Sequence, residues 1–328
     1  MTDVLMWGIL GTARINRKVM PGFRAGRGMK LLGIASRDRH RAEEYAAEND
    51  IPRAYAGYEE LLADPKIDCV YIPLPNHLHA EWSIRAVEAG KHVLCEKPFT
   101  MNAAEADAVA DASRRTGRLV MEAFMYRFHP QWARIRAMVE GGEIGELKIV
   151  RAQMGGHMRD FGDIRMKPEM GGGALMDIGC YCLNACRQVT RREPTWLVAT
   201  ANYERGVDVM LTALLRFPGD VLGEFNCGFR SNPHNDVEII GTEASVHTGN
   251  PWGPGPEEPI TLTMNRDNRV ETVTIPPSDE YLLQAEHFCD AVRGRAPLEW
   301  GIDDAARQMR GMDALAASAR TSEPVILG

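Results

Sequence analysis

Apolar runs that read as strands alternate with helix-forming segments over the first 120 or so residues, and this alternation constrains the fold more than any other feature. The predicted strands are residues 4–10, 29–35, 69–73, 92–95 and 119–123. Helical patterns fall between them, the first ending near residue 26 and the others spanning 39–49, 58–63, 77–89 and 103–116. Strands joined by helices of this length are typical of βαβ units with parallel strands. The N-terminal part is therefore predicted to be an α/β, doubly wound parallel sheet.

The rhythm changes after residue 144, where predicted strands follow one another across turns. These strands are residues 147–154, 195–203, 209–217, 221–229, 237–240 and 261–264, with helices near 179–188, 279–292 and 303–319. Strands without intervening helices indicate a mostly antiparallel sheet. We therefore predict two domains, 1–124 and 125–328, the second an α+β domain with a large open sheet, and we leave open that the last helices pack back across the boundary. The Pro- and Gly-rich stretch 251–256 is predicted to be a surface loop.

Charge and composition exclude several classes of protein. Lys and Arg number 38 against 45 Asp and Glu, a net charge of −7, which argues against binding the phosphate backbone of nucleic acids. The N-terminus shows no basic segment followed by a long apolar one, and no apolar run approaches membrane-spanning length, so we expect neither a signal peptide nor a membrane partner. Seven cysteines, an odd number set in apolar stretches, favour a reduced, cytoplasmic protein.

Two groups of residues raise the question of a metal. Cys180, Cys182 and Cys186 are clustered, but their spacing matches neither paired zinc ligands nor iron–sulfur runs, and free cysteines on a buried helix are common. His77 and His79 have a spacing that would suit a metal, yet no third ligand of the right type is evident. We predict no metal.

The turn after the first predicted strand is the first candidate ligand site. Gly11, Ala13 and Asn16 fill the three positions of G-x-G-x-x-G, so only the first glycine of the dinucleotide fingerprint is present. The turn nevertheless joins a strand to a helix at the start of a βαβ series, where backbone N–H groups would meet a pyrophosphate. The alternative is a tight turn that simply needs small residues. The cofactor contacts predicted here are Gly11, Thr12, Ala13, Arg14 and Ile15.

The end of the second predicted strand bears on which dinucleotide would bind. NAD enzymes usually carry Asp or Glu here, whereas this chain has Ser36 followed by Arg37, with Arg41 one turn into the next helix. A hydroxyl and two guanidiniums suit a 2′-phosphate. Asp38 leaves an alternative open, because a small loop shift would bring it near the ribose. The sequence predicts NADP(H).

Two further strand ends should face the same crevice, because ligands of open α/β sheets bind outside the carboxyl ends of the strands. Lys97 directly follows a buried strand, and Pro98 would aim it inward through a cis peptide or a rigid turn. The predicted cofactor contacts from these two loops are Pro73, Leu74, Asn76, His79, Glu96 and Lys97.

Five segments together make the chain similar to the glucose–fructose oxidoreductase/inositol dehydrogenase/rhizopine-catabolism (Gfo/Idh/MocA) family over essentially its whole length. They are residues 7–13 (WGILGTA), 75–79 (PNHLH), 89–98 (AGKHVLCEKP), 122–130 (EAFMYRFHP) and 171–181 (GGGALMDIGCY). Many relatives carry His at the position of Tyr181. The tyrosine form resembles the branch of glucose–fructose oxidoreductase, NADP-dependent aldose dehydrogenases and dihydrodiol dehydrogenases.

The resemblance implies a Rossmann domain followed by a mixed α/β domain on a large open sheet, and it assigns catalysis to Lys97, Asp177 and Tyr181. Tyr181 would move the hydroxyl proton, assisted electrostatically by Lys97, and Asp177 would orient a sugar hydroxyl or Lys97. Asp177 and Tyr181 are four residues apart on a predicted helix and should share a face. The predicted substrate-binding residues are Lys97, Arg127, Phe161, Arg165, Asp177 and Tyr181, with His129 a looser candidate.

The expected activity is therefore hydride transfer between nicotinamide and a sugar or polyol hydroxyl carbon, with aldose 1-dehydrogenase the leading form. Alternatives with the same machinery are dihydrodiol dehydrogenase, ketosugar or anhydrosugar reductase, and aldose–aldose oxidoreductase with tightly held NADP. A non-catalytic NADP-binding regulator is the alternative from another class. Because helices are too few to cover both faces of the C-terminal sheet, we expect a homodimer or homotetramer formed through that sheet.

Overall fold

The computed structural model describes residues 4–327, which form two compact units. The first unit comprises Met1–Met125 with Tyr281–Met309, and the second comprises Tyr126–Glu280 with Arg310–Gly328. The expectation about a signal peptide concerns the N-terminal segment, and its residues 1–3 lie outside the described part of the chain. Division of the sequence at residue 124 would assign 281–309 to the second domain, whereas their contacts assign them to the first unit.

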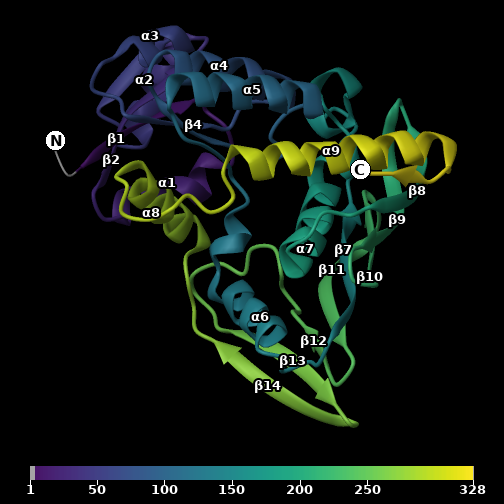
Figure 1. Cartoon of the computed structure of the whole chain (residues 1–328). Helices are drawn as coiled ribbons and strands as arrows, with labels where there is room; N and C mark the ends of the chain where they lie inside the picture. Colours follow the sequence, from purple (N-terminus) through teal and green to yellow (C-terminus); the bar gives the residue numbers. More distant parts are fainter. Residues whose placement is uncertain (1–3, 328) are drawn as a thin grey trace. The chain divides into compact units, whose positions relative to one another are not determined.

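The first unit is built on a six-stranded parallel sheet, as the alternation of strands and helices predicts (Figure 1). The strand order is β3-β2-β1-β4-β5-β6, with the order reversing beside β1. The strands are β1 (Leu5–Leu10), β2 (Met29–Ser36), β3 (Arg53–Ala56), β4 (Cys69–Ile72), β5 (His92–Cys95) and β6 (Val120–Glu122). Ligands of such sheets bind where the strand order reverses, so a ligand would contact the loops after β1, β2, β4 and β5.

Helices connect the strands of the first unit, and a further helix of this unit comes from the C-terminal part of the chain. They are α1 (Asn16–Ala25), α2 (Arg39–Glu48), α3 (Tyr58–Ala63), α4 (His79–Glu88), α5 (Ala103–Thr116) and α8 (Glu280–Val292). Trp7 of β1 packs against Phe23 of α1 and Phe288 of α8, with ring centroids 4.7 and 5.6 Å away. All three rings are fully buried, which explains why α8 belongs to this unit.

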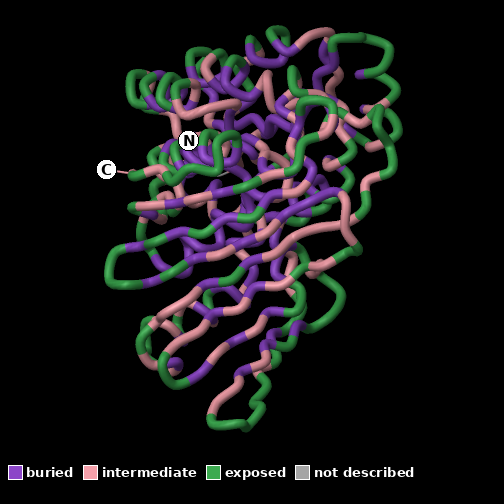
Figure 2. Tube along the Cα trace, turned by 90° about the vertical axis from the view of Figure 1, so that its right-hand side faces the viewer, coloured by how far each residue is buried: buried purple, intermediate pink, exposed green. Residues whose placement is uncertain are grey.

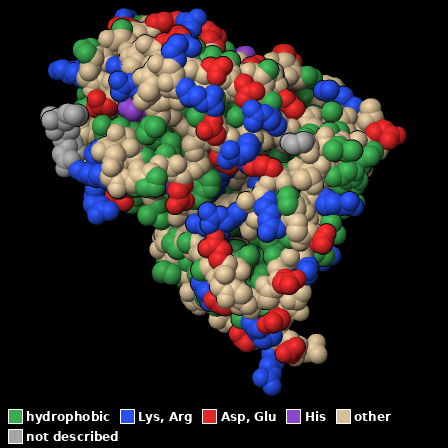
Figure 3. Space-filling model, in the orientation of Figure 1, with side chains coloured by type: hydrophobic (Ala, Val, Ile, Leu, Met, Phe, Trp, Pro, Cys, Tyr) green, Lys and Arg blue, Asp and Glu red, His purple; other side chains and the backbone are tan. Residues whose placement is uncertain are grey.

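Charged residues of both signs lie next to one another over the face drawn in Figure 3. In the first unit, Arg85 pairs with Glu59 at 2.8 Å and Arg115 with Glu88 at 2.7 Å, and all four side chains are exposed. Exposed pairs of this kind contribute at most about 1 kcal/mol each to stability. The fold must therefore rest on its apolar core.

The second unit is built on a nine-stranded sheet with the order β14-β13-β12-β11-β7-β10-β9-β8-β15. Every pairing is antiparallel except that of β7 with β10, which confirms the mostly antiparallel prediction. The strands are β7 (Leu147–His157), β8 (Trp196–Glu204), β9 (Val207–Phe217), β10 (Val221–Gly228), β11 (Arg230–Gly241), β12 (Ser245–His247), β13 (Ile260–Arg266), β14 (Arg269–Ile275) and β15 (Val325–Ile326).

The two faces of this sheet differ in burial. Figure 2 shows buried and more exposed positions alternating along its strands, and in β9 Leu211 and Ala213 are buried while Thr212 and Leu214 are exposed. Helix α7 (Cys180–Thr190) packs on β7 and β10, and Ser318 near the end of α9 (Ile302–Thr321) accepts a hydrogen bond from the Ala199 amide of β8 at 2.9 Å. One face is therefore the core of the unit.

Several elements were not predicted. The most substantial is α6 (Pro130–Glu140), which begins with Pro at its first position and has His129 as its N-cap. Residues 251–256 form a loop, as predicted, and Gly253 and Pro256 are exposed, but Pro251 and Trp252 at its start are buried. Pro251 accepts a hydrogen bond from Trp132 Nε1 of α6 at 3.0 Å, which fixes the loop against the helix.

No helix within residues 4–327 is long and apolar enough to cross a membrane. Over the same residues, no group of three or more His, Cys, Asp or Glu side chains is arranged to hold a metal ion. The seven cysteines are free and buried, so the cluster around Cys182 consists of core residues of α7.

Candidate active site

The turn after β1 has the geometry of a dinucleotide-binding turn despite its incomplete fingerprint. Gly11 has a φ of 109°, which favours glycine, and its amide donates to the Ala35 carbonyl of β2 at 2.9 Å. Asn16 occupies the position of the third glycine, is fully buried, and donates from Nδ2 to the Gly11 carbonyl at 2.9 Å. Its side chain closes the turn, so a third glycine is not needed. The backbone of residues 11–15 lies at the start of α1, where an anion would be stabilised.

The residues predicted to read a 2′-phosphate lie together after β2. Ser36 is buried, and its hydroxyl accepts from the Asp38 amide at 3.3 Å. Arg37 hydrogen-bonds the Tyr58 hydroxyl, and with Arg41 it opposes the rise in the Tyr58 pKa that burial causes. Both arginines are exposed, and Tyr58 is a neighbour that the sequence did not reveal.

Asp38, the acidic alternative, is used locally. Its carboxylate caps α2 by accepting from the Arg41 amide at 3.1 Å. This contact gives the carboxylate a structural purpose, and the reading of a 2′-phosphate by the two arginines stays a prediction.

His79 joins the loops after β4 and β5. Its Nε2 lies 2.7 Å from the Leu74 carbonyl, its Nδ1 lies 2.8 Å from the Pro98 carbonyl, and the ring is fully buried. Burial lowers the pKa of His79 to about 4, while the two carbonyls favour the protonated ring. The Lys97–Pro98 peptide is cis, one of the two arrangements that the sequence predicted. With both nitrogens engaged by the backbone, the ring fixes the lysine loop, and its contact with a cofactor stays a prediction.

Glu96 supports the same loop from the side of the sheet. Its Oε1 accepts from the Tyr71 hydroxyl at 2.6 Å, and Oε2 lies 3.3 Å from the Lys97 amide. Burial raises the pKa of Glu96, and the Tyr71 hydrogen bond and the Lys97 charge oppose that rise. Pro73, Leu74 and Asn76 lie in the loop after β4, at the edge of the sheet that the sequence predicted.

In the second unit, Asp177 and Tyr181 lie where a π-helical turn, η5 (Leu175–Gly179), runs into α7. The π turn makes the expected α-helical relation between them only approximate, and such turns are frequent at functional sites. Asp208 of β9 fixes the start of the turn, accepting from the Leu175 amide at 2.6 Å. Burial raises the pKa of Asp208, and its backbone hydrogen bonds oppose that rise. This residue was not predicted.

The glycine run before the helix is closely packed. Gly173 has a φ of 120°, and a Cβ there would lie 2.2 Å from Asp208 Oδ1. At Gly172 a Cβ would lie 2.5 Å from the Arg165 carbonyl. The glycines therefore let Asp208 and the Arg165 segment approach the start of the turn that leads into α7.

Arg165 contacts Asp177 directly. Its Nε donates to Asp177 Oδ2 at 2.7 Å, and its NH1 lies 3.3 Å from Asp163 Oδ1. Asp163 also caps the short helix η3 (Ile164–Met166) through the Arg165 amide at 3.0 Å. The guanidinium is thus held between two carboxylates, one of them on the predicted catalytic helix.

Tyr181 is only 6% exposed and lies among aromatic rings. The ring centroids of Tyr126 and Trp252 are each 5.7 Å from that of Tyr181 and 5.3 Å from each other. Trp132 of α6 packs on the same group, with its centroid 5.0 Å from that of Tyr126. These rings restrict the orientation of the Tyr181 phenol.

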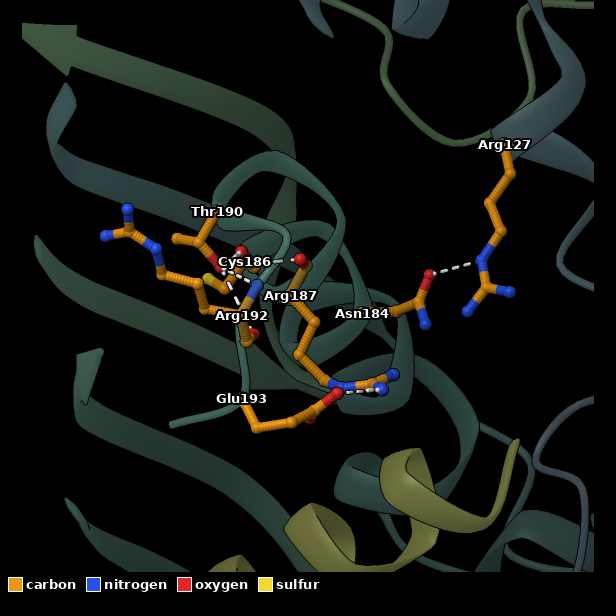
Figure 4. Close-up of polar contacts among 7 residues, drawn as sticks. All are labelled: Arg127, Asn184, Cys186, Arg187, Thr190, Arg192 and Glu193. Carbon is orange, nitrogen blue, oxygen red and sulfur yellow. Dashed lines mark hydrogen bonds and ion pairs between the residues drawn. The ribbon is translucent and has the colours of Figure 1, made fainter. Parts of the chain in front are cut away.

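The other predicted substrate residues differ in accessibility. Arg127 is 2% exposed and hydrogen-bonds Asn184 of α7 (Figure 4), so a contact with substrate stays a prediction. Phe161 is 43% exposed, and the guanidiniums of Arg205 and Arg230 lie 4.4 and 4.8 Å from its ring centroid. His129 is fully buried and serves as the N-cap of α6.

The predicted residues thus fall into two groups. The first unit brings together the turn after β1, the arginines after β2 and the Lys97 loop, and the second brings together Arg165, Asp177 and Tyr181. Sequence reasoning missed Tyr58, Trp252, Asn184 and Asp208. Tyr58, Trp252 and Asp208 are distant in sequence from every predicted motif. Asn184 could have been found, because a polar residue three positions after Tyr181 on a predicted buried helix indicates a role near Tyr181.

Comparison with known proteins bears on what these two groups do. A model described as an oxidoreductase family with an NAD-binding Rossmann fold matches residues 5–124, and a GFO/IDH/MocA C-terminal domain model matches residues 132–247. D-xylose 1-dehydrogenase (NADP(+)) 2 of Haloferax volcanii is 36% identical over 326 residues, with 98% of this chain and 100% of that protein covered. The chain belongs to the GFO/IDH/MocA oxidoreductase family.

Solved structures of other oxidoreductases match this GFO/IDH/MocA member along its length. A 3-ketoreductase from Actinomadura kijaniata, in complex with NADP and TDP-benzene, has a TM-score of 0.90 at 31% identity, with 96% of this chain and 98% of that chain covered. An aldose-aldose oxidoreductase from Caulobacter crescentus has a TM-score of 0.91 at 26% identity, with 99% and 100% covered. The chain is therefore an oxidoreductase with an NAD(P)-binding Rossmann domain.

Proposed function

We propose that this protein is an NADP-dependent dehydrogenase that transfers a hydride between nicotinamide and a sugar or polyol hydroxyl carbon, with the anomeric carbon of an aldose as the leading case. The observation that carries the proposal is the placement of Tyr181. Its ring packs among aromatic rings, and it follows Asp177, whose carboxylate pairs with Arg165, by one turn. Support comes from the xylose dehydrogenase, which is similar over the whole chain.

The residues of the first unit fit a dinucleotide. Gly11 leaves space at the start of α1 for a pyrophosphate, since it has a positive φ and no side chain. Arg37 and Arg41 supply two charges for a 2′-phosphate, and Ser36 supplies a hydroxyl. When bound, the cofactor accepts or delivers the hydride at its nicotinamide ring.

The chain's own residues would handle the proton and the orientation of the substrate. Tyr181 would take the proton of the reacting hydroxyl during oxidation and return it during reduction. Lys97 would hydrogen-bond the same oxygen and favour the ionised phenol. Asp177, held by Arg165, would accept a hydrogen bond from a neighbouring sugar hydroxyl.

A second candidate is reduction of a ketosugar, favoured by the similarity to the 3-ketoreductase. Dihydrodiol dehydrogenase, anhydrosugar reductase and aldose–aldose oxidoreductase with tightly bound NADP use the same residues and remain alternatives. A non-catalytic NADP-binding regulator is disfavoured, because it would have no need to keep Lys97, Asp177 and Tyr181 together.

We further propose that the protein is a homodimer or homotetramer formed through the open face of the second unit's sheet, and that it works in the reducing cytoplasm. The exposed apolar side chains of Leu214 and Leu222 support assembly. The seven free, buried cysteines support the compartment.

The proposed activity is tested with a panel of aldoses, polyols, ketosugars and dihydrodiols in the presence of NADP+ or NADPH, followed by the absorbance of the reduced cofactor. Turnover of an aldose with NADP+ is the expected result. Turnover of a ketosugar alone would favour the second candidate. Cofactor binding without turnover of any of them would favour the regulator. Mass analysis of cofactor released from the purified protein distinguishes tightly held NADP from exchangeable NADP.

A further inference from the structure

We propose that Asn184 is a positioning residue for the hydroxyl of Tyr181. Its amide oxygen joins Tyr126 and Arg127, and the Tyr126 ring packs against the Tyr181 ring. The proposal rests on the proposed function, because the position of the Tyr181 hydroxyl affects the rate only if Tyr181 transfers the proton.

The contacts lie in the interior of the second unit. Asn184 Oδ1 accepts from the Tyr126 hydroxyl at 2.6 Å and from Arg127 Nε at 2.8 Å. Figure 4 shows the Arg127 side chain pointing toward the amide of Asn184 on α7. Asn184, Tyr126 and Arg127 are 1%, 0% and 2% exposed, so water cannot readily replace the amide oxygen. A carbonyl oxygen has two lone pairs, which match these two donors.

The position of Asn184 on α7 connects this network to Tyr181. The two residues are three apart in a continuous helix, and residues at this spacing lie on the same face. The hydrogen bond to the Tyr126 hydroxyl holds that ring from one end. The same ring packs against Tyr181 in a tilted arrangement and against Trp252 edge to face, at centroid distances of 5.7 and 5.3 Å. The phenol of Tyr181 therefore packs against a ring whose own orientation depends on Asn184.

This dependence matters because proton transfer is sensitive to position. A displacement of about 1 Å at a reacting group can cost on the order of 100-fold in rate. If the Tyr126 hydroxyl loses its acceptor, the Tyr126 ring can rotate. The Tyr181 ring then loses a packing contact, and its hydroxyl is no longer held in one position. Binding of the cofactor to the first unit should not change, since none of these residues belongs to that unit.

The experiment compares three substitutions on α7 in the full-length protein with an accepted substrate. Asn184→Leu removes the acceptor and keeps the branched shape of the side chain, Asn184→Asp keeps an acceptor oxygen in the same place, and Gln188→Leu, which changes an amide to the same apolar side chain, is the matched control. Gln188 lies one turn further along α7, is also buried, and makes no hydrogen bond through its amide atoms with the described residues. We expect Asn184→Leu to lower kcat at least ~10-fold with NADP affinity unchanged, Asn184→Asp to recover most of that loss, and Gln188→Leu to match wild type.

Two results would overturn the proposal: wild-type kcat in Asn184→Leu, or a loss in Asn184→Asp as large as that in Asn184→Leu. Should Asn184→Leu fail to fold, Tyr126→Phe removes only the hydroxyl that donates to Asn184, and an unchanged kcat in that variant would equally refute the role. Tyr181→Phe measured alongside separates this inference from the proposed function. An active Tyr181→Phe contradicts the function, whereas an inactive Tyr181→Phe with a fully active Asn184→Leu contradicts only the positioning.

Discussion

The guanidinium of Arg165 donates to the carboxylate of Asp177 across 2.7 Å while it also lies 3.3 Å from Asp163. This ion pair connects the segment around η3 to the π turn that precedes α7. Both groups are only partly exposed, so the pair is less screened than one on the surface. It gives Asp177 a fixed orientation before any substrate binds.

Replacement of Arg165 by Met should therefore weaken substrate handling more than cofactor binding. A charged hydrogen bond of this type is worth roughly 1.5–3 kcal/mol, which corresponds to a loss of ~10–150-fold in kcat/KM. Steady-state kinetics with saturating NADP+ measures the effect, and Lys167→Met, two residues further along the same segment, serves as the control. Equal kinetics for the two variants would show that the pair does not prepare Asp177.

Arg37 should determine the preference for NADP over NAD. Arg37→Ala removes a guanidinium that hydrogen-bonds Tyr58, and we expect it to weaken NADP binding by roughly 1.5–3 kcal/mol with little change for NAD. Arg39→Ala is the matched control, because Arg39 is exposed and lies near Glu43 and Glu60 at 3.7 and 3.6 Å. Calorimetric titration of both cofactors measures the difference. Equal losses for NADP and NAD would exclude a role in reading the 2′-phosphate.

The fold was largely predictable because its strongest signals are local. Alternation of short apolar runs with helix formers gave the parallel sheet, and strands following one another across turns gave the antiparallel one. α6 was missed although Pro130 at its first position and Trp132, Ile135 and Met138 at helical spacing were present. β14 was missed because most of its residues are exposed and its apolar residues do not alternate regularly, although its Val, Thr and Ile residues favour a strand.

His129 should make stability depend on pH. Its Nδ1 accepts from the Gln131 amide at 3.2 Å, which requires an unprotonated nitrogen, and burial lowers its pKa from 6.5 to about 4. The unfolded chain therefore binds a proton that the folded one does not, so the free energy of unfolding decreases as pH falls from 6.5 toward 4. At about 1.4 kcal/mol per pH unit, the loss is at most ~3.5 kcal/mol.

The variant His129→Asn keeps a good N-cap without a titrating group and should reduce this dependence. Calorimetric melting at pH 7.5 and 5.0 compares the two proteins. The wild-type Tm should fall more than that of the variant over this range. The same shift in both proteins would place the dependence on other groups.

Leu214 provides a test of assembly. It is 49% exposed on the face of the sheet opposite the core, and Leu214→Glu should dissociate an assembly formed through that face. Light scattering measures the mass. Val270→Glu, which changes a 68% exposed residue on the edge strand β14, is expected to leave the mass unchanged. A monomeric wild-type protein at working concentration would defeat the proposal.

The candidate site was predictable to the extent that its residues lie in short motifs. Lys97, Asp177 and Tyr181 could be named from sequence because each belongs to a recognisable segment. The residues that hold Asp177 and Tyr181 could not be named, since Asp208 and Trp252 meet this part of the chain only through the folding of the sheet and its loops. His79 shows the converse case. It was predicted to contact the cofactor, whereas its ring nitrogens in the structure contact two backbone carbonyls.

The central claim is that Tyr181 transfers the proton and that Lys97 acts with it as a unit. Tyr181→Phe keeps the ring in its aromatic surroundings and removes only the hydroxyl, while Lys97→Met removes the ammonium at similar length. Each should lower kcat by about 10²–10⁴-fold with NADP binding mostly intact. Residues that act as a unit lose function non-additively, so the double variant should be little worse than either single one.

The most direct measurement is therefore kcat of Tyr181→Phe under saturating cofactor and substrate, together with calorimetric titration of NADP to the same preparation. The account predicts a loss of at least ~100-fold in kcat with wild-type affinity for NADP. A Tyr181→Phe variant that melts at a lower temperature but turns over at close to the wild-type rate would contradict it, and would assign Tyr181 to the packing of the aromatic group around Tyr126 and Trp252.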